Sequence, residues 1–278
     1  MPLVETPTPR RHGRLIAAVV RATKPLFHLH LALYRREVAR APFPRDARRM
    51  TVDGPDPDRL LFVGSIAVEG FGVLAHDLTC ASQTARLVGS ARGRGVTWHE
   101  VSAPVLTAAE AARVELPAGR ADAAVVLLGI CDVLLATSGT SWEASLRRLA
   151  VRVRETAGPD CRIVYVGIPP MAEFRPIPPV AKRLLTQQIE RLNALTARVA
   201  LTTPGASWVP FPEWRSEGLY HQELLSWATM HRRWGQAIAP TVVTSLVGAD
   251  AGAGAGAGAG ADAADSPCES GAGPGVPA

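Results

Sequence analysis

Short apolar runs alternate with helix-like stretches along most of this chain. Five runs have the length and composition of buried strands, at residues 60–64, 97–103, 123–129, 162–167 and 207–211. Helical spacing of apolar residues follows each run, at residues 82–93, 107–116, 140–158, 181–200 and 227–246. Strand and helix therefore alternate five times, which predicts a doubly wound parallel sheet. In such sheets ligands bind outside the carboxyl ends of the strands, so we expect the chemistry there.

Local signals define the ends of the helix predicted over 140–158. Thr140 followed by Glu143 has the spacing of a capping box, which would start the helix at this threonine. Gly158 stands where a helix C-cap belongs, because glycine adopts the left-handed conformation without steric cost. The pattern thus predicts both ends of this helix.

Composition divides the 278-residue chain into three parts. Residues 1–58 are predicted to form a basic arm with an amphipathic helix, since residues 1–50 hold eleven Lys and Arg against three acids. Residues 59–247 are predicted to form the folded domain. Residues 248–278 are rich in Gly and Ala and hold no large apolar residue except Val276, so we expect a disordered tail.

Several functional classes lack support in the sequence. The four cysteines have no short spacings that would indicate a zinc site or a disulfide framework, and no phosphate-binding glycine loop is present. We therefore expect neither a metal nor a cofactor, and no specific nucleic-acid binding. Arg21, Lys24 and Pro25 interrupt the apolar stretch near the amino end, so no transmembrane span or signal peptide is predicted. These features favour a cytoplasmic protein, peripheral to a membrane at most.

The ordered blocks of the chain resemble the SGNH (GDSL-type) hydrolases over residues 59–244. The resemblance is carried by the motifs LLFVG…EGFGV, VTWHEVSA…TAAEA, AAVVLLGICDV and RIVYVGIPPM, followed by a Trp-bearing helix. It implies a flavodoxin-like α/β/α sandwich with a five-stranded parallel sheet, and ester hydrolysis as the usual activity. The family's chemistry uses a serine nucleophile activated by His and Asp. Its oxyanion site uses the serine amide, a glycine amide and an asparagine side chain.

Two alignments are open at the family's nucleophile. An ungapped match from Gly64 to Gly70 puts Ser65 at the family's aspartate and Ile66 at the nucleophile. A gapped match, with Val68 as the added residue, restores Ser65 as the nucleophile. Ser65 also fits a helix N-cap, whose hydroxyl would accept from an amide of the following turn. The loop length is equal in both alignments, so the sequence leaves the choice open.

The oxyanion positions depart from the family pattern. Aligning Trp98 and Thr107 with the family's usual residues puts Val105 at the glycine, where a β-branched side chain crowds the site. Cys131 stands at the asparagine, and a thiol is a weak donor. Cys131 is either a packing residue or, with a lowered pKa, a reactive thiol. Asp132 matches the next family residue and is expected to hydrogen-bond loop amides.

The acid–base pair also departs from the pattern. Counting back from Trp234 puts Gln222 at the family's aspartate and Leu225 at its histidine. A rival alignment uses Glu217 and His221, and it lengthens the family's DxxH spacing. Leucine cannot move a proton, so the simpler alignment leaves no base.

The sequence therefore favours a pseudoenzyme that retains a ligand pocket or an interaction surface without efficient ester hydrolysis. A divergent esterase that uses Ser65 with His221 is the first alternative. A membrane-surface scaffold is the second, because the basic residues of 9–49 would be attracted weakly to anionic lipid. The partner is an unidentified small molecule or protein.

Overall fold

The computed structural model describes residues 25–171, 178–213 and 227–258. The amino-terminal part of the predicted arm lies outside this description. So do four positions of the predicted acid–base alignments, Glu217, His221, Gln222 and Leu225.

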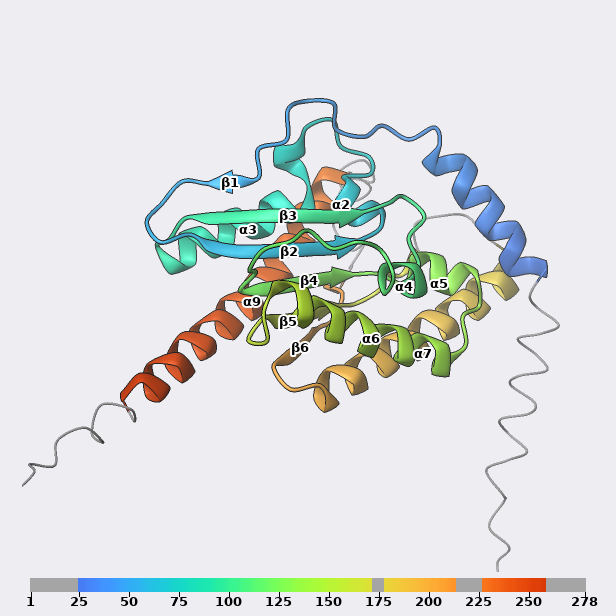
Figure 1. Ribbon diagram of the computed structural model, residues 1–278. Coiled ribbons are helices and arrows are strands. Elements are labelled where there is room, and N and C mark those ends of the chain that lie inside the picture. Colours follow the sequence, from blue (N-terminus) through green and yellow to red (C-terminus); the bar gives the residue numbers. More distant parts are fainter. Residues whose placement is uncertain (1–24, 172–177, 214–226, 259–278) are drawn as a thin grey trace, which may run out of the picture.

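A sheet of six strands forms the centre of the described structure (Figure 1). Five strands run parallel: β2 (Asp58–Gly64), β3 (Val96–Ser102), β4 (Ala123–Leu127), β5 (Arg162–Val166) and β6 (Ala206–Val209). They coincide with the five predicted runs, so the predicted parallel sheet is confirmed. A sixth strand, β1 (Thr51–Val52), pairs antiparallel with β3 at the edge, giving the order β1-β3-β2-β4-β5-β6. The strand count of five was therefore one too low, because two residues are too short for a visible alternation.

Helices cover both faces of the sheet. Successive side chains of β2 point to opposite faces of the sheet. Leu60 and Phe62 belong to one core, and Leu61 and Val63 belong to the other. The first core packs under α3 (Cys80–Arg92) and α9 (Trp227–Gly258). The second packs under α4 (Ala108–Ala111), α5 (Ile130–Leu134), α6 (Gly139–Ala157) and α7 (Pro179–Thr202). The result is the three-layer α/β/α sandwich that the resemblance implied.

A helix over residues 25–38 packs on the second core. Its buried side chains recur every three or four residues, at Phe27, Leu31, Tyr34 and Val38, as expected of one face of a helix. The helix lies beside the ends of the strands marked by the arrowheads, which are their carboxyl ends (Figure 1). This helix therefore shares a core with β2, although it precedes the predicted boundary between arm and domain at residues 58–59.

Helix α9 extends beyond the predicted end of the domain. The expectation of disorder from residue 248 is wrong as far as Gly258, where the helix ends. Alanine has the highest helix propensity, which favours continuation through the Gly/Ala-rich sequence. The extension is also fastened, because the Asp250 carboxylate accepts a hydrogen bond of 2.8 Å from Arg92.

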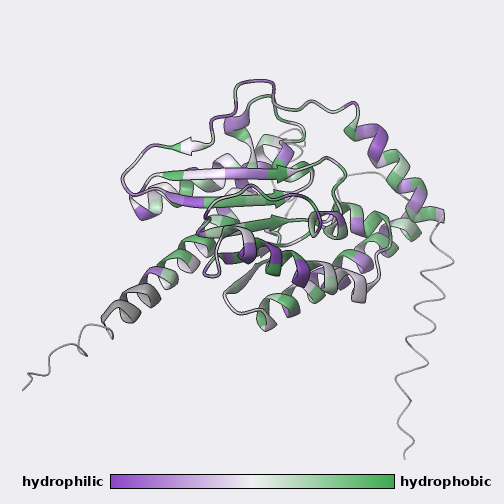
Figure 2. Ribbon diagram, in the orientation of Figure 1, coloured by the Kyte–Doolittle hydropathy of each residue, from purple (hydrophilic) through white to green (hydrophobic). Residues whose placement is uncertain are grey.

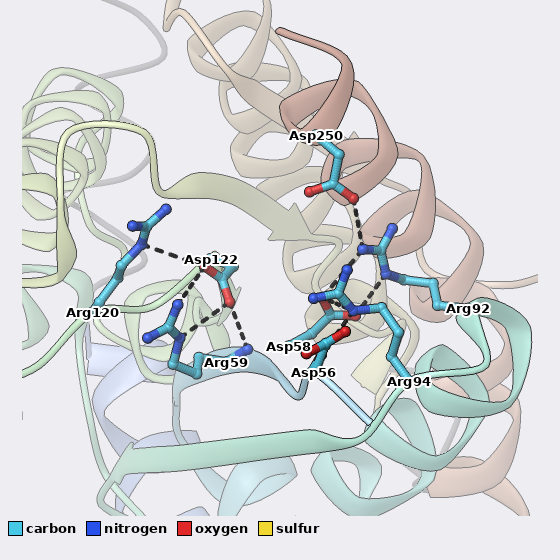
Figure 3. Close-up of polar contacts among 8 residues, drawn as sticks. All are labelled: Asp56, Asp58, Arg59, Arg92, Arg94, Arg120, Asp122 and Asp250. Atoms are coloured by element: carbon cyan, nitrogen blue, oxygen red, sulfur yellow. Dashed lines mark hydrogen bonds and ion pairs between the residues drawn. The ribbon is translucent and has the colours of Figure 1, made fainter. Parts of the chain in front are cut away.

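That contact belongs to a polar network at the amino ends of the strands (Figure 3). Asp58 accepts from Nε of Arg92 at 2.6 Å and from its terminal nitrogen at 3.2 Å, and Arg94 lies 3.3 Å from the same carboxylate. Asp122 forms a second pair with Arg59. The network joins the start of β2 to the ends of α3 and α9. It lies at the opposite end of the strands from their carboxyl ends, where the candidate site is expected.

The ends of α6 test the local predictions. Its N-cap is Ser138, whose hydroxyl accepts from the Ser141 amide at 3.2 Å, so the capping box predicted at Thr140 is wrong. Thr140 lies inside the helix, because Ser138 already has the extended backbone that an N-cap requires. The predicted C-cap at Gly158 is confirmed, with a φ of 115°.

Candidate functional site

A cavity of about 270 Å³ lies at the carboxyl ends of the strands. The helix over residues 25–38 forms one wall, and the first turns of α9 form another. The remaining lining comes from α2 (Ile66–Glu69), α5, α7 and the segment after β5. Most lining side chains are apolar, and the polar ones among the described residues are His30, Tyr34, Glu37 and His231. The cavity therefore occupies the place where ligands bind in this kind of sheet.

The turn from β2 into α2 presents an isoleucine to this cavity. A side chain at Gly64 would lie 2.7 Å from the Leu127 carbonyl oxygen, so only glycine allows β2 to end this close to β4. Ser65 is 1% exposed and is not among the residues that line the cavity. Its hydroxyl has no hydrogen-bond partner among the described residues. Ile66 does line it.

The predicted capping role of the Ser65 hydroxyl is wrong. Ser65 stands at the N-cap position of α2, but its side chain makes no capping hydrogen bond. The hydrogen bonds that Ser65 gives to the start of the helix come from its carbonyl oxygen, which accepts from the amides of Val68 and Glu69 at 3.0 and 3.2 Å. Within the described part of the chain the hydroxyl is therefore a buried polar group without a partner, and such a group is rare and destabilising.

Tyr34 connects the helix over residues 25–38 to the loop that contains Val105. The resemblance assigned Val105 to the position of the oxyanion glycine. The Tyr34 hydroxyl donates to the Pro104 carbonyl at 2.9 Å, next to Val105. Val105 is half-buried and packs against the second core. No signal in the sequence placed Tyr34 here, because the apolar spacing of its helix shows which face is buried but not what that face covers.

Cys131 is fully buried at the start of α5. Burial, together with a smaller effect of the neighbouring Asp132 charge, raises the pKa of its thiol to about 12. The Tyr34 hydroxyl lies within hydrogen-bond reach of the same thiol, with a smaller opposite effect on this pKa. The thiol is therefore protonated at neutral pH, which contradicts the reactive-thiol hypothesis and fits a packing residue.

Asp132 holds two neighbouring loops. Its carboxylate accepts from the Ala108 amide at 3.0 Å and from the Thr137 hydroxyl at 3.2 Å. Burial raises the pKa of Asp132 to about 6, although both hydrogen bonds act in the opposite direction. The carboxylate thus ties the start of α4 to the end of α5, in line with the loop role expected from the sequence.

His231 is a lining residue that the sequence analysis missed. Its Nδ1 accepts from the Cys80 amide at 3.1 Å, so its Nε2 carries the proton and donates to the Phe71 carbonyl at 3.0 Å. Burial lowers the pKa of His231 to about 4. The ring is neutral with both nitrogens engaged, so it has no lone pair for a substrate proton. The available signal was its helical spacing with Trp227 and Trp234, which places all three on one face.

No nucleophile is paired with a base among the described residues that line the cavity. Among the described residues, no group of His, Cys, Asp and Glu could hold a metal ion. No helix in the described part of the chain has the length and apolar character needed to cross a membrane. The arrangement can enclose a small ligand and contact it chiefly through apolar surface.

Comparison with known proteins supplies the family. The model of the GDSL-like Lipase/Acylhydrolase family matches residues 64–235, which is more than half of the chain. The chain belongs to this family. The match begins at Gly64, so the helix that carries Tyr34 lies outside the matched residues. A comparison with curated proteins finds no match.

Solved structures of hydrolases are among the similar folds. The chain is similar to TesA, with 17% identity, a TM-score of 0.47, and coverage of 68% of this chain and 99% of TesA. An extracellular lipase from Streptomyces rimosus gives 13% identity, a TM-score of 0.46, and coverage of 68% and 99%. A family two carbohydrate esterase from Clostridium thermocellum, an active-site mutant, gives 14% identity and a TM-score of 0.45. The alignment covers 69% of this chain and 65% of that esterase, slightly less than two thirds.

Proposed function

We propose that the protein is a pseudoenzyme of the GDSL-like family that keeps a ligand cavity and lacks efficient ester hydrolysis. The observation that carries the proposal is the cavity wall at the β2–α2 turn, which is formed by Ile66 while Ser65 is buried. Acyl transfer by this family requires a nucleophilic hydroxyl that reaches the substrate. An isoleucine at that point supports the ungapped alignment.

The oxyanion positions support the same proposal. Val105 adds a branched side chain, and Cys131 offers a protonated thiol in place of a carboxamide. The Tyr34 hydroxyl lies between them, bonded to the Pro104 carbonyl and close to the thiol. A developing oxyanion would therefore meet a donor already committed to a carbonyl, whereas catalysis depends on donors directed at the charge that forms.

Hydrolysis of p-nitrophenyl acetate tests the proposal. The natural protein should release p-nitrophenol at the rate of buffer containing an unrelated protein. Ser65→Ala and His221→Ala should leave that rate unchanged. Turnover well above background that either substitution abolishes would overturn the proposal and establish the alternative, a divergent esterase that uses Ser65 with His221.

The cavity further supports binding of a neutral, largely apolar molecule that carries an oxygen acceptor. Trp234 lines the cavity and is buried, and the described residues supply no hydrogen-bond partner for its indole N–H. Buried donors are normally paired, so an acceptor on a ligand would remove this cost. A charged ligand is disfavoured, because the apolar lining would desolvate it and His231 is neutral.

Quenching of tryptophan emission tests this second part of the proposal. The probes are 4-bromoacetophenone, which carries a carbonyl acceptor, and bromobenzene, which does not. Saturable quenching should be lost in Trp227→Phe/Trp234→Phe and kept in the matched pair Trp98→Phe/Trp208→Phe, which does not line the cavity. The ketone should bind about three- to tenfold more tightly, the effect of one hydrogen bond. Unsaturable quenching, or equal quenching of both double variants, would contradict the proposed cavity ligand.

A further inference from the structure

The helix over residues 25–38 and the turn after it carry two stripes of side chains on opposite faces. The buried stripe is Phe27, Leu31, Tyr34 and Val38. The exposed stripe, which repeats the same spacing two residues later, is Leu29, Leu33, Arg36 and Arg40. Two residues correspond to about 200° around an α-helix. Docking of the first stripe on the core therefore fixes the second stripe so that it faces outward.

The exposed stripe combines apolar and basic side chains. Leu29 is 57% exposed and Leu33 is 48% exposed, one turn apart on the same face. The basic residues of the outer face are exposed as well. The helix's acid, Glu37, is half-buried and lines both the cavity and a neighbouring groove. Figure 2 shows the mixture of hydrophobic and hydrophilic residues along this helix. A single exposed leucine needs no explanation, but two beside a row of arginines form an amphipathic surface.

A neighbouring groove extends this surface toward α9. From the helix and the turn after it, the charged and large apolar residues that line the groove are Leu33, Arg36, Glu37 and Arg40. Phe71 and Trp227 line it as well. Tryptophan and arginine are suited to the boundary between lipid headgroups and acyl chains, because each joins an apolar body to a polar end. The groove thus adds a half-buried indole to the same face.

We propose that this stripe contacts the surface of an anionic lipid bilayer. Leu29 and Leu33 would enter the headgroup region, and Arg36 and Arg40 would lie against lipid phosphates. Charge complementarity carries the choice, since Arg35, Arg36 and Arg40 are exposed on the helix and the turn after it, whereas the one acid there, Glu37, is half-buried. The stripe is about 16 Å long from Leu29 to Arg40, a line contact that fits a plane. With only two leucines inserted, the contact is weak, reversible and sensitive to salt.

Co-sedimentation of the full chain with vesicles tests the proposal. One set of vesicles is phosphatidylcholine with phosphatidylglycerol, and the other is phosphatidylcholine alone. Binding should require the anionic lipid and should fall with added salt. Leu29→Ser/Leu33→Ser and Arg36→Gln/Arg40→Gln should each lower the partition coefficient about tenfold or more. The controls are exposed pairs on α6 and α7, Val151→Ser/Leu201→Ser and Arg148→Gln/Arg183→Gln, which should bind as the natural protein does.

The outcomes distinguish this stripe from the rest of the chain as the source of lipid affinity. Unchanged binding by both stripe variants would overturn the proposal and assign the affinity to other basic residues of the chain. Equal binding to neutral vesicles, or no binding, would overturn it too. Sedimentation velocity would show whether the natural protein is a dimer that Leu29→Ser/Leu33→Ser dissociates, in which case a second copy covers the stripe and the proposal fails. None of these results depends on ester hydrolysis.

Discussion

Burial shifts the pKa values of Asp132 and His231 in opposite directions. Asp132 has its pKa raised to about 6, and His231 has its pKa lowered to about 4, in both cases chiefly through desolvation. The two shifts have opposite consequences for stability. An unfolded histidine titrates near 6.5, so the folded state loses stability as the pH falls from there to about 4. An unfolded aspartate titrates near 3.8, so the folded state gains stability as the pH falls from about 6.

We predict that these two contributions nearly cancel between pH 4 and 6 and that single substitutions uncover them. In His231→Gln, the free energy of unfolding should rise on acidification relative to the natural protein, because Asp132 still takes up a proton on folding. In Asp132→Asn it should fall on acidification, because His231 remains. Each effect should approach about 3 kcal/mol across the window.

Urea unfolding at several pH values measures these slopes, with the exposed His99→Gln as the control. Parallel pH profiles for the natural protein and both variants would contradict the assignment of these groups. The comparison concerns slopes, so a constant loss of stability in either variant does not affect it.

The residue scale also shows where sequence reasoning on the site ended. Val105, Cys131 and Asp132 could be assigned because each follows a strand whose length the pattern predicts. Ser65 and Ile66 could not be ordered, since both alignments have the same loop length and differ only in which side chain faces the cavity. Tyr34 and His231 could not be found, because they reach the site by tertiary packing from elements distant in the sequence.

At the scale of elements, apolar periodicity predicted the five parallel strands and the main helices. It failed where length or packing decides the outcome. β1 has two residues and gives no alternation. The extension of α9 depends on a contact between Asp250 and Arg92, which lie 158 residues apart in the sequence. Composition alone therefore predicted disorder where the structure has a helix.

The network at the amino ends predicts unequal roles for its two aspartates. The side chains of Asp58 and Arg92 are 5% and 6% exposed, whereas that of Asp250 is 61% exposed. Asp58→Asn should cost about 3 kcal/mol or more, because it leaves a buried guanidinium without its bidentate partner. Asp250→Asn should cost less than about 1 kcal/mol, as expected of an exposed partner screened by water. Urea unfolding of both variants measures the difference, and equal losses would contradict it.

Truncation tests how far α9 contributes to stability. Deletion of residues 251–278 keeps Asp250 and removes a Gly/Ala-rich segment whose only large apolar residue is Val276, ten or more residues beyond the described helix. The melting temperature should therefore stay unchanged within error, since little is lost to offset the ordering entropy of that segment. A fall of several degrees would show that the segment docks on the domain.

At the scale of the whole molecule, an element outside the family-matched region completes the cavity. The family model begins at Gly64, yet the helix over 25–38 forms a wall of the cavity and places Tyr34 beside the predicted oxyanion positions. The same helix turns a leucine and arginine stripe outward. One segment therefore contributes to the closed inner site and to the proposed bilayer contact.

This arrangement makes the loss of hydrolysis depend on several parts of the molecule at once. We predict that Ile66→Ser alone stays at background toward p-nitrophenyl acetate, since a serine without a base remains a protonated alcohol. The five family residues can be restored together as Ile66→Ser, Val105→Gly, Cys131→Asn, Gln222→Asp and Leu225→His. This variant should remain impaired while the Tyr34 hydroxyl lies at the oxyanion positions, where one lost donor typically costs about 10²–10³ in rate.

Adding Tyr34→Leu to the five changes should therefore raise hydrolysis above that of the five alone, because it removes the hydroxyl and keeps an apolar side chain on the docked face. Leu33→Ala, on the opposite face of the same helix, is the matched control and should change nothing. Circular dichroism must show each variant folded. Hydrolysis by Ile66→Ser alone would show that the remaining machinery is intact. Equal rates with and without Tyr34→Leu would show that the helix does not obstruct the site.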